Sequence, residues 1–372
     1  MSLTQVQEYL QAEPFNSVYC TPTTTPTSSS SSSSAPSRAA LPASARDSAP
    51  APAPGPLRLA HTAVRACDAD DGEYKKPLGG DTFDSIHPAT EEKLHSFARG
   101  MKEDVDAAVE AAQAAWANGT GAWAQMSATE RAGYVRKMCD GIEANAEMLA
   151  HIEAADTGKT YADAFGGING AADEGRHWCD LGAVLDAEQD LPQPTNIDGS
   201  SADGFRVVMR RDPIGIVGLI SAWNYPLNVA FRKVAPALVA GNCAILKPSE
   251  LAGLTCMYLG QLASEAGIPP GVFSVIPGGA RNASSRLRAC CCKHCALLGT
   301  ADRDAGAALA ANPAVMAISF TGSSATGSAI IANTAERVGA TFLELGGKSA
   351  LVVFDGAQAS LQAQPLGAPA GA

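Results

Sequence analysis

A carboxylate near the end of the chain stands where it could act as a general base. Glu344 ends an apolar segment and precedes two glycines, in the run Leu343-Glu344-Leu345-Gly346-Gly347-Lys348-Ser349. Glycines at that point let backbone and ligand approach each other closely. Apolar surroundings raise the pKa of a carboxylate, which suits a base that takes up a proton near neutral pH. The run therefore predicts a general base at Glu344.

A second candidate lies in the turn Trp223-Asn224-Tyr225-Pro226, which follows an apolar run and opens a predicted helix. Proline suits the first helical turn, where a backbone N–H has no partner within the helix. The side-chain amide of Asn224 could donate to an oxygen that becomes negative during a reaction. Because asparagine is also common in ordinary turns, the residue type alone leaves both roles open.

Two further corners could bind a nucleotide. Lys247-Pro248-Ser249-Glu250 places a cation and an acid at a strand end, where both could face a ribose or form a plain surface ion pair. Phe320-Thr321-Gly322-Ser323 opens a helix whose N–H groups and dipole suit a pyrophosphate. Gly322 and Gly327 lack the spacing of the dinucleotide fingerprint, so an ordinary glycine-bearing helix start remains the alternative.

These motifs follow one another in the order found in the aldehyde dehydrogenase superfamily. The run around Glu344 resembles its glutamate active-site signature, and residues 213–250 resemble its cofactor region almost throughout. Residues 87–91 and 156–159 also match family landmarks, so the resemblance covers roughly residues 72–355 and is closest to betaine-aldehyde-type members. It implies an α/β fold with a Rossmann-type parallel sheet and flanking helices.

The resemblance implies NAD-dependent oxidation of an aldehyde to a carboxylic acid. Glu344 would be the general base, Asn224 the oxyanion donor, and Lys233 a lysine held near the base. Lys247 and Glu250 would hold the adenosine ribose, and a carboxylate at Glu250 would repel the additional phosphate of NADP. The cofactor-binding residues would be Ser221, Trp223, Lys247, Ser249, Glu250, Gly278, Gly322, Ser323, Gly327 and Leu345.

Three departures from the family pattern qualify this prediction. The nucleophilic cysteine that follows the glutamate in the family would lie beyond Ala372, with most of the catalytic domain, and the tail 356–372 does not resemble the family. The chain is therefore expected to be inactive as it stands, and a catalytically dead nucleotide-binding or interaction protein is the alternative function. Arg232 occupies a position where betaine-type relatives usually carry tryptophan, which leaves Tyr225 to face a trimethylammonium group and makes betaine aldehyde an unfavourable substrate.

The third departure is an unusual insert at residues 280–303, which contains Cys290-Cys291-Cys292-Lys293-His294-Cys295. Three consecutive cysteines cannot all turn toward one tetrahedral ion, so no metal site is predicted. The ten cysteines are unevenly spaced in a chain long enough for a large core, which favours a reducing compartment over a disulfide framework.

Residues 1–71 are predicted to be a disordered leader. A run of seven serines is followed by Ala/Pro repeats, which leaves too little apolar side chain to offset the ordering entropy. Scattered arginines in this acid-poor segment are typical of an organelle transit peptide, whereas Glu8 and Glu13 favour a plain disordered tail. The cytoplasm is the expected compartment, and a plastid or another organelle is the alternative.

The composition of the chain limits the kinds of partner that it could bind. A net charge of −11 argues against a nucleic-acid surface, and no apolar run reaches the ~20 residues that span a bilayer. A small aldehyde is the expected partner. The family resemblance implies a homo-oligomer, which is doubtful for this chain because its oligomerisation strand would also lie beyond Ala372.

The elements that must position these residues follow from the hydrophobic pattern between the leader and the tail. Apolar strands alternating with helices predict a parallel sheet covered on both faces, with ligands at the carboxyl ends of the strands. The predicted helices are 104–117, 129–154, 161–178, 226–239, 253–266 and 323–336. The predicted strands are 206–211, 214–221, 243–247, 272–276, 315–320, 341–345 and 351–354.

Overall fold

The structure is a computed structural model that describes residues 82–192, 194, 197, 206–278, 305–350, 352 and 354. The predicted leader (1–71), the insert (280–303) and the tail (356–372) lie outside the described residues. The boundaries assigned to these three segments stay predictions.

A five-stranded parallel sheet forms the centre of the described chain, in the order β7-β6-β5-β8-β9. Its strands β5 and β6 are buried along their whole length, as expected for a parallel sheet with helices on both faces. The strands are β5 (Ile216–Ile220), β6 (Cys243–Lys247), β7 (Phe273–Val275), β8 (Val315–Gly322) and β9 (Ala340–Leu345). The predicted α/β class and parallel sheet are confirmed.

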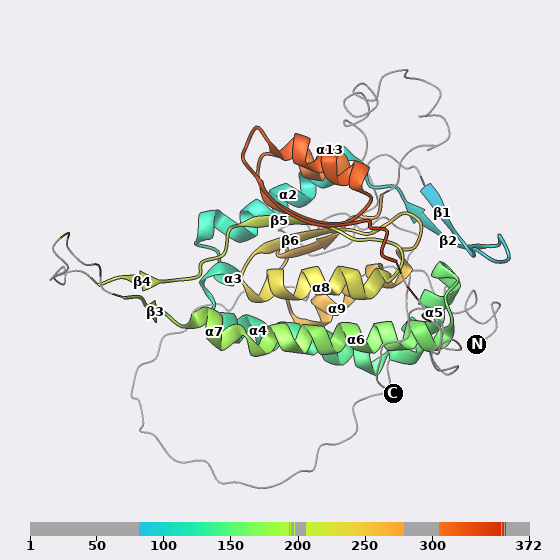
Figure 1. Cartoon of the computed structure of the whole chain (residues 1–372), viewed down its shortest axis with the longest axis horizontal. Coiled ribbons are helices and arrows are strands. Elements are labelled where there is room, and N and C mark those ends of the chain that lie inside the picture. The colour runs from blue at the N-terminus through green and yellow to red at the C-terminus, as the bar shows by residue number, and fades with distance from the viewer. Residues whose placement is uncertain are drawn as a thin grey trace, which may run out of the picture.

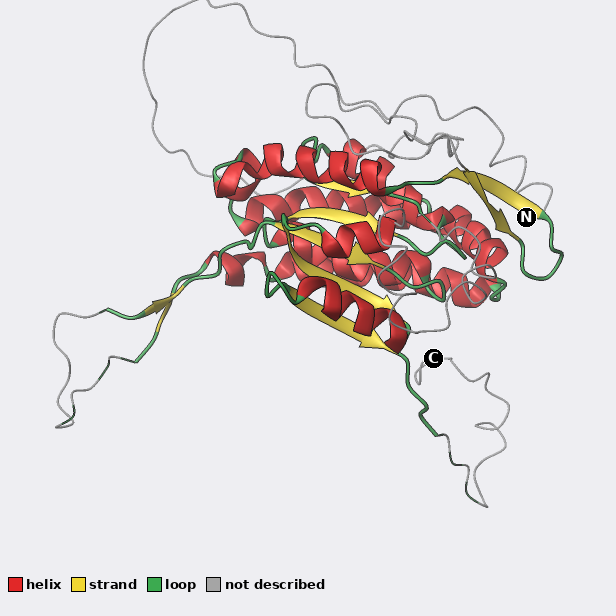
Figure 2. Ribbon diagram, turned by 90° about the horizontal axis from the view of Figure 1, so that it is seen from above, coloured by secondary structure: helices red, strands yellow, loops and turns green. Residues whose placement is uncertain are grey.

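Helices cover the sheet in layers (Figures 1 and 2). One face carries α2 (Lys102–Trp116), α12 (Ala305–Ala311) and α13 (Ser324–Thr334), and the other carries α8 (Pro226–Val239) and α9 (Leu254–Ala266). A second layer packs on the outer side of α8 and α9 and consists of α4 (Ala128–Ala144), α5 (Ala146–Thr157) and α6 (Tyr161–Asp180). Short helices are η1 (Ala117–Gly119), α3 (Ala122–Gln125) and α7 (Gly182–Asp186).

Two antiparallel ribbons lie at opposite ends of the molecule (Figure 1). Strands β1 (Thr82–Ile86) and β2 (Lys93–Ala98) pair beside α5, at the end toward which the sheet strands run. Strands β3 (Gln189–Asp190) and β4 (Val208–Met209) form a narrow ribbon that extends away from the body. The six-residue strand predicted over 206–211 is therefore reduced to two residues.

Two other predicted elements differ from the structure. The single helix expected over 129–154 is divided into α4 and α5 at Asn145, whose backbone leaves the helical region (φ −112°, ψ 15°). The Asn145 side chain donates to the carbonyl of Gly141 at 2.8 Å, and such local side-chain bonds compete with helical ones. Of the strand predicted at 351–354, the described residues Val352 and Phe354 are not in a strand.

None of the helices in the described ranges is long and apolar enough to cross a membrane.

Candidate active site and cofactor edge

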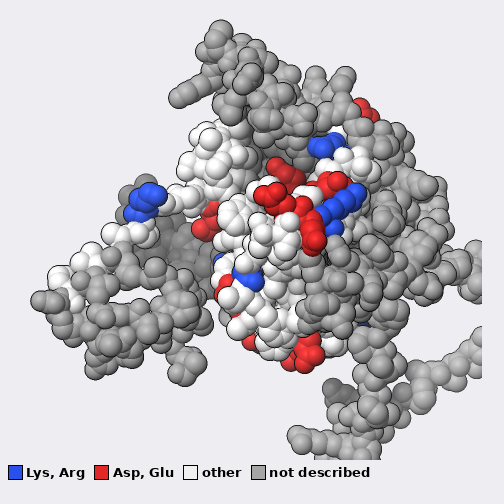
Figure 3. Space-filling view, turned by 90° about the vertical axis from the view of Figure 1, so that its right-hand side faces the viewer, with Lys and Arg blue, Asp and Glu red and all other residues white. Residues whose placement is uncertain are grey.

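The parallel strands bring the predicted site residues to one edge of the sheet. Lys247 and Phe320 both pair with Ile220 at the end of β5, and Glu344 pairs with Thr321 on β8. Ser221 follows β5 directly, and its backbone N–H donates to the carbonyl of Lys247 at 3.2 Å. Figure 3 shows the face toward which these strands run, where acidic side chains gather with basic ones beside them.

Lys233 reaches this edge from α8. Its side chain is buried, and Nζ donates to the hydroxyl of Ser319 on β8 at 3.0 Å. Burial lowers the pKa of Lys233 to about 8, and the carboxylate of Glu344 acts in the opposite direction. Lys233 and Glu344 are therefore close enough to interact electrostatically.

Glu344 itself is exposed, which corrects the expectation of apolar surroundings. The expectation came from Leu343 and Leu345, its neighbours in sequence, but successive side chains on a strand point to opposite faces. Among the described strands β9 is also an edge of the sheet, so no further strand covers it.

The turn before α8 presents Trp223 and Asn224 to solvent, and the Trp223 side chain is 53% exposed. Tyr225 is the N-cap residue of α8, and Pro226 occupies the first helical position as the sequence predicts. The Tyr225 hydroxyl donates to Asp163 Oδ1 at 2.9 Å, and this bond to a carboxylate raises the pKa of Tyr225. The turn is thus attached to α6 by a long-range contact.

Lys247 and Glu250 form an ion pair at the end of β6, with Nζ and Oε2 3.1 Å apart. The lysine side chain is 10% exposed and the carboxylate 41%, so one partner is held by the fold while the other faces solvent. Ser249 accepts a hydrogen bond from the backbone N–H of Leu251 at 3.2 Å and so shapes the turn that joins the pair to α9.

The corner after β8 has the geometry of a capped helix start. Ser323 is the N-cap of α13, and its hydroxyl accepts from the backbone N–H of Thr326 at 3.2 Å. Gly322 closes β8 immediately before it. At Gly327 a Cβ would lie 2.7 Å from Leu345 Cδ2, so this glycine lets α13 pack closely on β9. Gly327 and Leu345 thus have a packing role, and their cofactor-binding roles stay predictions.

Gly278 follows β7 at a similarly crowded position. A Cβ there would lie 2.9 Å from that of Ala305 and 3.0 Å from the carbonyl oxygen of Gly100. The absence of a side chain at Gly278 lets its segment approach those of Gly100 and Ala305 closely.

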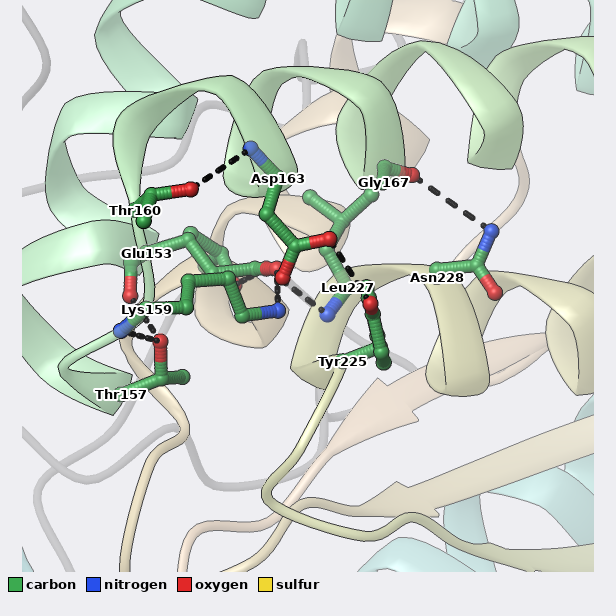
Figure 4. A network of polar contacts seen from close by, with 10 residues as sticks. Glu153, Thr157, Lys159, Thr160, Asp163, Gly167, Tyr225, Leu227 and Asn228 are labelled. Carbon is green, nitrogen blue, oxygen red and sulfur yellow. Dashed lines mark hydrogen bonds and ion pairs between the residues drawn. The ribbon is translucent and has the colours of Figure 1, made fainter. Parts of the chain in front are cut away.

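Two buried carboxylates of α5 were given no site role from the sequence. Asp156 was matched only as part of a family landmark, and Glu153 was overlooked. Glu153 is fully buried, forms an ion pair with Lys159 (Oε1 to Nζ, 3.0 Å) and lies in the network of Figure 4. Asp156, three residues later, accepts from the Ser85 hydroxyl at 2.6 Å and from the backbone N–H of Leu254 at 3.0 Å. Burial raises the pKa of Asp156 to about 6. The sequence signal that could have identified these two residues is a pair of acids three positions apart on the apolar face of a helix.

A sequence model described as the aldehyde dehydrogenase family matches residues 75–290 and 293–367. The chain belongs to this family. The matched ranges include parts of the predicted insert and tail.

Curated relatives include enzymes from plants. The chain is 41% identical over 285 residues to aminoaldehyde dehydrogenase 2, peroxisomal, of Pisum sativum, covering 76% of this chain and 51% of the relative. It is 37% identical over 286 residues to the chloroplastic betaine aldehyde dehydrogenase of Beta vulgaris, covering 77% and 52%. The chain thus spans about half the length of the curated relatives it matches.

Solved structures agree with the fold. The NAD+ complex of an aldehyde dehydrogenase from Bacillus cereus has a TM-score of 0.66 and 31% identity, with 81% of this chain and 54% of that chain covered. A betaine aldehyde dehydrogenase from Staphylococcus aureus, in complex with NAD+, has a TM-score of 0.65 and 30% identity, with 77% and 52% covered.

Proposed function

We propose that this chain carries the NAD-binding part of an enzyme that oxidises an aldehyde to a carboxylic acid. The observation that carries the proposal is that Lys233 lies within electrostatic reach of Glu344 at the carboxyl edge of one parallel sheet, where the turn of Asn224 also follows β5. Ligands of such sheets bind at this edge. Membership of the aldehyde dehydrogenase family supports the reaction class.

The residues present suit a dinucleotide. The Ser221 hydroxyl is buried at the end of β5 without a hydrogen bond of good geometry, and the sulfur of Cys256, a weak acceptor, is the group that interacts with it among the described residues. Such a hydroxyl would gain a partner from a bound cofactor. Lys247 and Glu250 would hold the ribose, and the α13 N-terminus at Ser323 would face the pyrophosphate. When bound, NAD supplies the hydride acceptor.

Each proposed catalytic residue has a task that its position allows. The exposed amide of Asn224 can donate to the aldehyde oxygen as negative charge develops on it. The exposed carboxylate of Glu344 can take a proton from water, and the amine of Lys233 lies near it.

No nucleophile is assigned among the described residues. Their four cysteines (Cys139, Cys179, Cys243 and Cys256) are all buried, and burial raises the pKa of Cys243 to about 12. The expectation that the thiol of the complete enzyme lies beyond Ala372 stays a prediction.

The substrate is proposed to be a small aldehyde. Arg232 is held by two hydrogen bonds to Glu174 (2.8 and 3.0 Å), so its charge is offset by a neighbouring carboxylate. This pairing weakens the expected repulsion of a cationic substrate, but it supplies no aromatic face. A cytoplasmic location is a proposal of the same kind, with a plastid or another organelle as the alternative, and the two plant relatives are named as peroxisomal and chloroplastic.

Calorimetry with the full chain tests the cofactor assignment. NAD should bind more tightly than NADP. Glu250→Gln should reduce the difference between the two affinities, because it removes the charge that repels the additional phosphate of NADP. Lys247→Ala should weaken NAD binding by about tenfold, the scale of one charged hydrogen bond. Lys93→Ala, which removes a lysine paired with Asp84 at 3.0 Å outside the proposed site, is the matched control.

Tighter binding of NADP, or an unchanged NAD affinity in Lys247→Ala, would contradict these roles. NAD binding without aldehyde-dependent reduction is the result expected of the chain as it stands, and reduction of NAD by a small aldehyde would contradict the expected inactivity.

A further inference from the structure

A buried acid holds the start of the helix that follows the Asn224 turn. Glu153 Oε2 accepts from the backbone N–H of Leu227, in the first turn of α8, at 3.3 Å. The same oxygen accepts from the hydroxyl of Thr255, in the first turn of α9, at 3.1 Å. Backbone N–H groups of a first turn have no partner within their own helix, and a carboxylate satisfies them well. Glu153 therefore joins α5 to the starts of two helices that follow sheet strands.

Lys159 attaches the same acid to the turn itself. Its Nζ lies 3.0 Å from Glu153 Oε1 and 3.7 Å from the centre of the Tyr225 ring (Figure 4). A cation this close to an aromatic face is attracted to it, and more strongly where both groups are partly withdrawn from water. Tyr225 is the residue directly after Asn224.

Two contacts from α6 complete the support of the ring. The Tyr225 hydroxyl donates to Asp163, and Asp163 lies in the first turn of α6 next to the cap residue Thr160. A Cβ at Gly167 would lie 3.1 Å from Tyr225 Cδ1, so α6 approaches the ring closely. The ring is thus held through its face, its edge and its hydroxyl.

We propose that Glu153 and Lys159 are positioning residues for the turn Trp223-Asn224-Tyr225. Their ion pair holds the first turn of α8 through Leu227 and the aromatic ring through Lys159. It thereby fixes the direction in which Asn224 presents its amide. The inference rests on the function proposed for Asn224, because a fixed amide matters only if it meets a reacting oxygen.

Stability alone is a weak reason for this arrangement. Glu153 is fully buried and the Lys159 side chain is 10% exposed, so both charges are largely withdrawn from water. Apolar residues of similar volume often replace such pairs without loss of stability. What apolar side chains cannot do is accept from Leu227 and place a cation on Tyr225 at the same time.

Four variants of the full chain separate positioning from folding. Lys159→Met removes the cation but leaves Glu153 buried and unpaired, which lowers stability by itself. Glu153→Gln combined with Lys159→Met removes both charges, so the unpaired carboxylate disappears while Tyr225 still lacks its cation. Lys159→Arg keeps the charge. Lys137→Met is the matched control, because Lys137 Nζ lies 5.3 Å from the ring centre of Tyr134, away from the site.

Two readouts are taken beside the melting temperature. One is NAD affinity by calorimetry. The other is fluorine NMR of chains labelled with fluorotryptophan, which contain four tryptophans and in which Trp223→Phe assigns the Trp223 signal. In the double variant we expect a melting temperature close to that of wild type, a Trp223 signal that is shifted or broadened, and NAD affinity reduced by about fivefold. Lys159→Arg keeps the cation and should give the Trp223 signal and the NAD affinity of the wild-type chain. Lys137→Met should also leave both unchanged.

A double variant with the wild-type Trp223 signal and wild-type NAD affinity would overturn the inference and reduce the pair to a structural role. If Lys159→Met fails to fold, the double variant and Lys159→Arg still decide between these outcomes. Failure of the wild-type chain to bind NAD would count against the proposed function instead, and the fluorine signal would then decide the positioning role alone.

Discussion

At the scale of single residues, Lys233 shows two environmental effects acting on one ammonium group. Burial under the sheet disfavours the charged form, while Glu344 favours it, and the net result is a pKa of about 8 instead of the usual 10.5. The Ser319 hydroxyl is the neutral partner that holds the amine in place at 3.0 Å. The amine therefore changes charge close to physiological pH, next to the proposed base.

This shift predicts a pH dependence of stability. Between about pH 8 and pH 10.5 the unfolded chain keeps the Lys233 proton that the folded chain has lost, so the free energy of unfolding should rise with pH in that window. Lys233→Met should abolish this rise. Urea unfolding at a series of pH values measures it, and equal slopes for the two proteins would show that Lys233 titrates in the ordinary range.

At the scale of elements, α6 lies against α4 and α8 through a glycine. At Gly175 a Cβ would lie 2.4 Å from Phe231 Cε1 and 2.7 Å from Cys139 Sγ, whereas a Cβ at Gly166 of the same helix would meet nothing within 4 Å. Since α6 also carries Asp163 and Glu174, its distance from α8 affects the contacts made to Tyr225 and Arg232.

Two glycine substitutions in α6 should therefore have opposite effects. Gly166→Ala should stabilise the chain by about 0.5–1 kcal/mol, the usual gain of alanine over glycine inside a helix. Gly175→Ala should destabilise it by about 1–3 kcal/mol, because the added methyl overpacks the interface. Denaturant midpoints test both, and a stabilising Gly175→Ala would mean that Phe231 can move aside freely.

At the scale of the whole molecule, the described sheet has an edge at β9 with exposed apolar side chains. Phe342 on this strand is 62% exposed, and Met316 on β8 is 51% exposed. A strand edge with unpaired backbone groups and exposed apolar residues favours association with another chain.

The chain is therefore expected to self-associate through this edge. Phe342→Ser should shift sedimentation velocity profiles toward the monomer at micromolar concentration, because it removes the largest exposed apolar group of the strand. Val184→Ser, at a 53% exposed valine of α7 distant from β9, is the control. A wild-type chain that sediments as a monomer would contradict the prediction.

Much of the element pattern could be predicted because its signals are local. The predicted bounds of α8 and β6 coincide with the structure, since proline marks the start of the helix and a short apolar run marks the buried strand. The division of 129–154 at Asn145 could not be seen, because α4 and α5 both continue an apolar pattern and only the chain path shows the break.

By itself, the sequence determined the family, the alternation of strands and helices that builds the parallel sheet, and the position of several candidate residues at strand ends, because periodicity, capping and motif spacing act over short distances along the chain. Only the tertiary structure decided that Glu344 is exposed, that Lys233 meets Ser319, and that Glu153 supports the start of α8. These contacts join residues 86 and 74 positions apart in the last two cases. They depend on how layers pack, since burial and electrostatic partners are properties of the assembled fold rather than of any segment.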